Sequence, residues 1–106
     1  MTDREPFDKL VRDEIPAVIA ENGETPETHV ATGAEYRRRL HEKLDEEVAE
    51  FHDDPGAGEL ADVREVLDAL RDIHDIDEER VASARREKAA ERGRFEDGIV
   101  LDRVER

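Results

Sequence analysis

The sequence lacks cysteine altogether, and aromatic residues make up only 4% of its 106 positions. Without cysteine the chain can form neither a disulfide framework nor a thiolate catalytic or metal site. Charged residues make up 45% of the chain, a proportion that can indicate disorder, but the apolar residues recur at helical spacing. We therefore expect a folded protein with a small hydrophobic core, which a homodimer or a dimer of dimers would complete.

Long apolar runs are also missing, and the first five residues, Met1 to Glu5, are mostly polar. This pattern predicts neither a signal peptide nor a membrane-spanning helix. We expect a cytoplasmic protein that has no membrane partner.

Positive charge is scarce, with 17 Lys and Arg against 31 Asp and Glu and a net charge of −14. This balance argues against a nucleic acid polymer as partner, because phosphate backbones require a basic surface. Only three of the basic residues are lysines (Lys9, Lys43 and Lys88). An acid-rich, lysine-poor surface suits a halophilic, salt-rich cytoplasm. A GC-rich coding bias is the alternative explanation for the excess of arginine over lysine.

Helix signals divide the chain into four segments. The first runs from an N-cap at Asp13 to Gly23, and the second from a capping box of Thr32 and Glu35 to about Asp53. The breaker 54–58 precedes a third helix to about His74, and a fourth runs from Asp77 to Gly93. We predict one all-α domain, residues 1–106, built as a four-helix bundle in which the second and third helices form an antiparallel hairpin.

Two pairs of acids flank the breaker. Glu47 and Glu50 are three residues apart on the second helix, and Glu59 and Asp62 are three apart on the third. Both cross-helix pairings are centred between residues 54 and 55, so an antiparallel hairpin would bring all four carboxylates face to face. They border the apolar stripes of their helices, where a solvated acid has no reason to lie.

Four such anions repel one another unless protons or divalent cations share the site. Carboxylate oxygens suit Mg²⁺ or Mn²⁺, and Mg²⁺ commonly bridges to substrate phosphates. We expect Glu47 and Glu50 also to act in catalysis, since a carboxylate beside such a cation can take a proton from water. The alternative is an acidic surface, because Asp and Glu pairs at this spacing are common in so acidic a chain.

Four segments, taken in order, resemble the all-α nucleotide pyrophosphohydrolase superfamily, which includes MazG-like enzymes, dimeric dUTPases and phosphoribosyl-ATP pyrophosphohydrolases. They are residues 9–16 (KLVRDEIP), 43–50 (KLDEEVAE), 59–63 (ELADV) and 88–95 (KAAERGRF). The family's Glu-x-x-Glu and Glu-x-x-Asp metal pattern falls on Glu47, Glu50, Glu59 and Asp62. Only eight residues separate Glu50 from Glu59, fewer than is common in MazG-like members. The resemblance implies Mg²⁺-dependent attack of water that releases pyrophosphate and a nucleoside monophosphate.

The three lysines lie inside these segments, and two arginines accompany them. Lys43 shares a helix face with Glu47 and Glu50, Lys88 and Arg92 form an i, i+4 pair, and Lys9 and Arg12 precede the first helix. We predict that these five residues bind the substrate phosphates. Ordinary ion pairing for Lys43, and complementation of the helix dipole for Lys88 and Arg92, are the alternatives.

The resemblance therefore implies a Mg²⁺-dependent hydrolase that cleaves a nucleoside triphosphate, including noncanonical ones, to a monophosphate and pyrophosphate. Two alternatives remain open. One is a phosphoribosyl-ATP pyrophosphohydrolase of histidine biosynthesis, and the other is a non-catalytic helical binding module.

Overall fold

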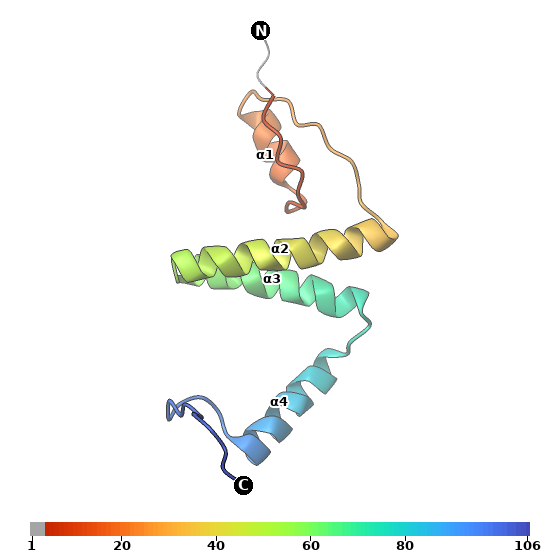
Figure 1. Ribbon diagram of the computed structural model, residues 1–106. Helices are drawn as coiled ribbons and strands as arrows, with labels where there is room; N and C mark the ends of the chain where they lie inside the picture. Colours follow the sequence, from red (N-terminus) through yellow and green to blue (C-terminus); the bar gives the residue numbers. More distant parts are fainter. Residues whose placement is uncertain (1–3) are drawn as a thin grey trace. The chain divides into compact units, whose positions relative to one another are not determined.

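A computed structural model describes residues 4–106 of the chain, which in this range contains four α-helices and no β-strand (Figure 1). The helices are α1 (Ile15–Glu21), α2 (Gly33–Asp53), α3 (Ala57–Ile73) and α4 (Glu78–Arg92). The all-α prediction is confirmed. The chain divides into two compact units, Met1–His74 and Asp75–Arg106, which are described separately below.

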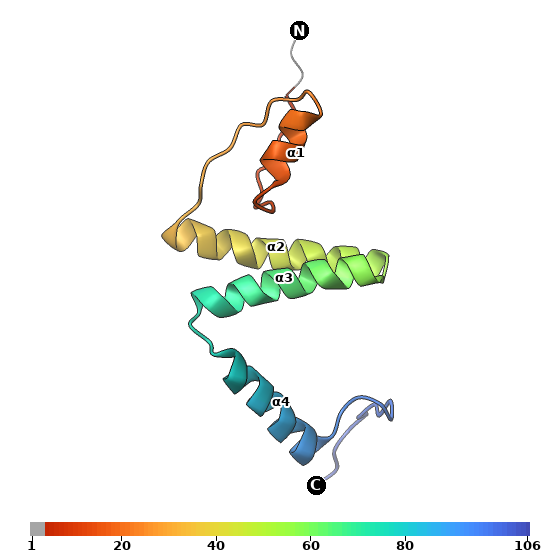
Figure 2. The same ribbon diagram turned by 180° about the vertical axis from the view of Figure 1, so that it is seen from behind.

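Helices α2 and α3 form an antiparallel hairpin and run side by side in both ribbon views (Figures 1 and 2). The turn between them, residues 54–56, lies at the predicted breaker. Asp54 closes α2 by donating its backbone N–H to Glu50 O at 3.0 Å. Leu60 N–H donates to the carbonyl of Gly56, the N-cap of α3, also at 3.0 Å. The predicted hairpin is confirmed, and it brings the two acid pairs onto adjoining helices.

The core of the first unit lies between α2 and α3 and is as small as the composition predicts. Leu40, Val66 and Leu70 are buried, with 2%, 8% and 7% of their surface exposed. Partly buried side chains pack around them: Leu10, Tyr36, Leu44, Ala69 and Ile73. Along α3 the predicted apolar stripe is only partly covered, because Leu60 and Leu67 remain 43% and 46% exposed.

The ends of α1 and α2 differ in detail from the sequence prediction. The N-cap of α1 is Glu14 rather than the predicted Asp13, and Pro16 lies in the first turn. Thr32 is the N-cap of α2, but its side chain caps no backbone N–H, so the predicted capping box is wrong. Glu35, its expected partner, instead lies 2.8 Å from His29 and also accepts from Arg39. A charged partner competes successfully with a neutral backbone donor for this carboxylate.

The second unit consists of α4 and the segment that follows it. Asp77 caps α4 as predicted, because its Oδ1 accepts the Glu79 N–H at 2.8 Å. Gly93 ends the helix with a φ of 78°, a left-handed conformation that glycine adopts without strain. The apolar run Ile99, Val100 and Leu101 is exposed. Among the described residues, no helix combines the length and the apolar character needed to cross a bilayer.

Candidate metal and phosphate site

Glu47 is the buried acid of the site, with only 7% of its surface exposed. It lies on the α2 face that carries Leu40 and Leu44, seven and three residues earlier, so helical periodicity turns it toward α3. Its Oε1 is 3.2 Å from Lys43 Nζ, whereas its Oε2 has no hydrogen-bond partner. A buried carboxylate oxygen without a partner is costly, which makes Glu47 the candidate cation ligand of the site.

Glu50 lies one turn further along α2, on the solvent side of Glu47. Its carboxyl group meets that of Glu47 as a hydrogen-bond partner and as a like charge, and both effects raise the pKa of Glu50. The two predicted α2 ligands are therefore close enough for Glu47 to disfavour ionisation of Glu50. Protons or a cation would relieve that repulsion.

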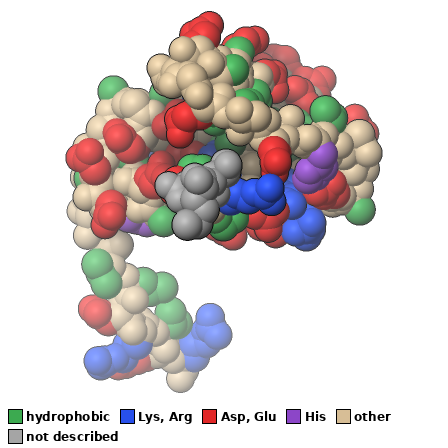
Figure 3. All heavy atoms as spheres, turned by 90° about the horizontal axis from the view of Figure 1, so that it is seen from above, with side chains coloured by type: hydrophobic (Ala, Val, Ile, Leu, Met, Phe, Trp, Pro, Cys, Tyr) green, Lys and Arg blue, Asp and Glu red, His purple; other side chains and the backbone are tan. Residues whose placement is uncertain are grey.

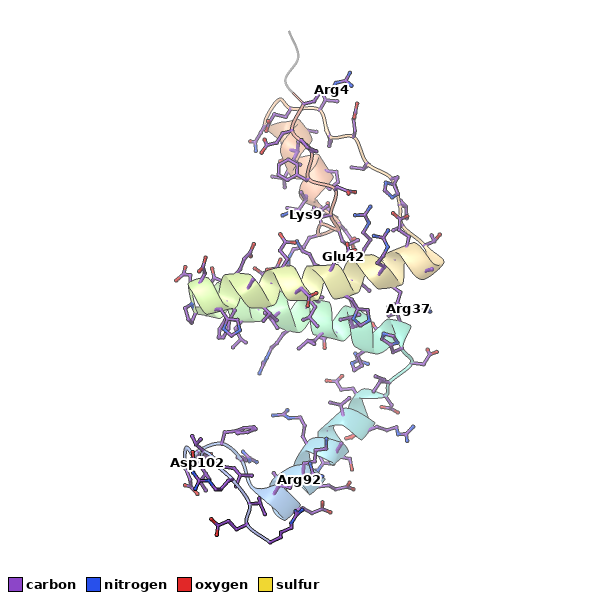
Figure 4. The ribbon with its side chains drawn as sticks, viewed as in Figure 1. Arg4, Lys9, Arg37, Glu42, Arg92 and Asp102 are labelled. Carbon is purple, nitrogen blue, oxygen red and sulfur yellow. The ribbon has the colours of Figure 1, made fainter. Side chains whose placement is uncertain are left out.

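Two lysines converge on Glu46, a residue that the sequence analysis did not single out. Lys9 Nζ lies 2.6 Å from Glu46 Oε1, and Lys43 Nζ lies 3.1 Å from Glu46 Oε2. Figure 4 shows Lys9 between α1 and α2. Partial burial opposes ionisation of Glu46, but the hydrogen bonds from the two lysines outweigh it and lower its pKa. Lys9 and Lys43, both predicted phosphate ligands, are thus brought together beside Glu47.

Arg12 connects the segment before α1 to α3. Its Nη2 donates to Asp62 Oδ1 at 2.8 Å, and this hydrogen bond raises the pKa of Arg12. The negative charges of Glu65 and Glu47 act on the same guanidinium and raise its pKa further. Two predicted site residues therefore meet, but as partners of each other rather than as separate contacts to a cation and a phosphate.

A third contact between residues far apart in the sequence holds the segment that carries Lys9 and Arg12. Arg39 on α2 donates to both the backbone carbonyl and the carboxylate of Asp8, each at 2.8 Å. Asp8 adopts a left-handed φ of 44°, a conformation that Asp tolerates better than most residues. Leu10 packs against the core between these polar contacts. The sequence left the position of this segment open, and these contacts place it against α2 and α3.

Glu59, the fourth predicted ligand, turns back over the start of its own helix. A Cβ placed on Gly56 would lie only 2.9 Å from Glu59 Oε2, so the absence of a side chain at Gly56 makes room for this carboxylate. An acid in the first turn is favourable there, because it faces the positive end of the helix dipole.

Within residues 4–106, no three or more Asp, Glu or His side chains converge closely enough to hold one ion together. Glu47 and Glu50 are adjacent, whereas Asp62 is paired with Arg12 and Glu59 covers Gly56. A joint site of all four carboxylates stays a prediction.

The predicted phosphate ligands Lys88 and Arg92 lie on α4, in the other unit, so their role also stays a prediction (Figure 4).

Two histidines meet at the end of the hairpin that lies away from the turn. His41 on α2 and His74 after α3 have their Nε2 atoms 3.2 Å apart. Their ring planes are inclined by 61°.

Acidic side chains are spread over the visible face of the molecule, and basic ones occur in fewer places (Figure 3).

Comparison with known proteins gives no match to a family model, to a curated protein or to a solved structure.

Proposed function

We propose that this protein is a Mg²⁺-dependent nucleotide pyrophosphohydrolase that converts a nucleoside triphosphate to a monophosphate and pyrophosphate. The observation that supports it best is Glu47, a buried carboxylate whose Oε2 lacks a partner, beside a second carboxylate whose pKa it raises. The resemblance to the pyrophosphohydrolase superfamily identifies the same two residues as metal ligands.

The donor set of the hairpin fits a hard divalent cation. Glu47, Glu50, Glu59 and Asp62 offer only carboxylate oxygens, and they lie on two helices joined by a three-residue turn. Mg²⁺ bound there would neutralise phosphate charge and make water more acidic. Mn²⁺ has similar ligand preferences and would serve as a substitute.

The chain's own residues supply the remaining chemistry. Glu50 is exposed and contact with Glu47 raises its pKa, which suits it to accept a proton from the water that attacks the phosphoanhydride bond. Lys43 stays protonated next to Glu46 and Glu47, and its ammonium group can stabilise charge on the departing pyrophosphate. Lys9 adds a second ammonium group, on the other carboxylate oxygen of Glu46.

We further propose that two or four copies build a MazG-type bundle around this hairpin. The described hairpin buries only three hydrophobic side chains, a small core for a stable helical protein. The half-exposed Leu60 and Leu67 on α3 provide apolar surface for a second copy. The net charge of −14 suits such an assembly in a salt-rich cytoplasm, where screening weakens repulsion between copies.

The experiment is a screen for released pyrophosphate and monophosphate with Mg²⁺, using standard, deoxy and damaged triphosphates and phosphoribosyl-ATP. We expect turnover of at least one triphosphate and a loss of roughly a hundredfold or more in Glu47→Gln. The matched control is Glu42→Gln, which removes the same charge from an exposed α2 position paired with Arg38. Turnover of phosphoribosyl-ATP alone would favour a phosphoribosyl-ATP pyrophosphohydrolase of histidine biosynthesis. No turnover by the wild type would contradict the proposed activity and favour the non-catalytic helical binding module.

A further inference from the structure

Arg12 occupies the position from which a cation would neutralise Asp62. Its guanidinium lies 2.8 Å from Asp62 Oδ1 and within the electrostatic influence of Glu47 and Glu65. Lys9 and Lys43, the other nearby cations, are both paired with Glu46. The positive charge closest to Asp62 in this part of the chain is therefore the guanidinium of Arg12.

The sequence analysis predicts that Asp62 binds a metal ion and that Arg12 binds a substrate phosphate. Both roles conflict with the observed ion pair between the two residues. Asp62 cannot give the same oxygen fully to a guanidinium and to a divalent cation, and Arg12 cannot contact a phosphate while it holds Asp62. Two positive groups placed on one carboxylate also repel each other. Occupation of Asp62 by one of them therefore disfavours the other.

We propose that Arg12 is an internal cation that competes with the divalent ion for Asp62, and that ion binding frees its guanidinium for the substrate phosphates. In the metal-free protein Arg12 limits the repulsion among the acids of the hairpin. Once Asp62 turns to the ion, Arg12 becomes available at the edge of the site. Metal entry and phosphate recognition are thereby coupled through one ion pair.

The local structure allows this exchange without disturbing the fold. The side chains of Arg12 and Asp62 are 56% and 40% exposed, and ion pairs this exposed break at low cost. The contacts of Arg39 with Asp8 and of Lys9 with Glu46 hold the same segment independently. Arg12 therefore stays close to the site after it leaves Asp62.

This inference rests on the proposed function, since it takes Glu47 and Asp62 as cation ligands. The experiment is isothermal titration of Mg²⁺ alone, at fixed KCl, into the wild type, Arg12→Gln, Arg38→Gln and Glu47→Gln. Arg38→Gln is the matched control, because Arg38 is an exposed arginine whose partner Glu42 lies on the same helix. Both arginine variants change the net charge equally, so a difference between them reports the position of Arg12.

We expect Arg12→Gln to bind Mg²⁺ about two- to fivefold more tightly than Arg38→Gln, which is the range an exposed ion pair spans. Equal or weaker binding by Arg12→Gln, with uptake still lost in Glu47→Gln, would overturn the competition but leave the metal site intact. Absence of specific uptake by every protein, Arg12→Gln included, would overturn the metal site and the competition together.

A second measurement needs no variant. The side-chain Nε–Hε NMR signal of Arg12 should shift when Mg²⁺ is added to the wild type, while that of Arg38 should remain unchanged. A signal from Arg12 that stays constant as Mg²⁺ saturates the protein would contradict displacement, even if Arg12→Gln failed to fold.

Discussion

Lys9 Nζ and Glu46 Oε1 lie 2.6 Å apart, although 37 positions separate the two residues in the sequence. Glu46 accepts from Lys43 on its other oxygen, so one carboxylate joins the segment before α1 to the middle of α2. Glu47, the next residue, contacts Lys43 through its Oε1 and meets the carboxyl group of Glu50, whereas its Oε2 has no hydrogen-bond partner. Glu46 thus holds both lysines beside Glu47.

The lowered pKa of Glu46 predicts a loss of stability in acid. A carboxyl group whose pKa is lower in the folded state stabilises the protein above its unfolded pKa, about 4.3, and loses that contribution as the pH falls through the folded value. We expect the melting temperature to fall below about pH 4.3, and to fall less in Glu46→Gln. Thermal melts across this range test it, with Glu42→Gln as the control, and identical slopes for Glu46→Gln and wild type would contradict it.

The pKa of Glu50 is shifted in the opposite direction to that of Glu46. Because contact with Glu47 raises its pKa, its contribution to stability is fully present below the unfolded pKa and is lost as the pH rises through the folded value. We therefore expect Glu50→Gln to be more stable than the wild type at neutral pH without divalent metal, and the difference to vanish in acid. Paired melts in a chelating buffer measure this, and a neutral-pH variant that melts below the wild type would rule it out.

Metal and monovalent salt should stabilise the protein by separable mechanisms. KCl should act gradually on the charge of −14, whereas Mg²⁺ should act at low concentration on the carboxylates of the hairpin. At a hundredfold excess over Kd, binding to the folded state alone adds about 2.7 kcal/mol. The test is a melt series in fixed high KCl with titrated Mg²⁺, on wild type and a Glu50→Gln, Asp62→Asn double variant. Equal stabilisation of both proteins would mean that Mg²⁺ acts on the surface in general.

Two leucines on the hairpin provide a test of its core. Leu40→Ala removes the most buried core side chain and should lower the free energy of unfolding by about 2–5 kcal/mol. Leu67→Ala, at a position 46% exposed, should change it by no more than about 0.5 kcal/mol in a monomer. Urea unfolding at several protein concentrations measures both. A cost for Leu67→Ala that grows with protein concentration would indicate that a second copy covers this face, and a small cost for Leu40→Ala would contradict the described core.

Much of the local structure could be predicted from the sequence because short-range rules govern it. The breaker predicted at 54–58, the cap at Asp77 and the terminal Gly93 act on backbone groups within one helical turn. The observed helices follow them, except that α3 begins at Ala57, inside the predicted breaker. Leu40 and Leu70, which belong to the apolar stripes of α2 and α3, lie in the core. The periodicity of these stripes placed Glu47 beside the core, where it is buried.

Only the tertiary structure decided the partners of the charged residues. Glu35 bonds to His29 and Arg39 instead of capping α2, and Asp62 pairs with Arg12, 50 positions away. Periodicity states which side of a helix a residue occupies, but not which distant segment lies against that side. That choice depends on the path of residues 8–12 over α2 and α3, where Leu10 packs on the core and the ion pairs on either side follow from its position.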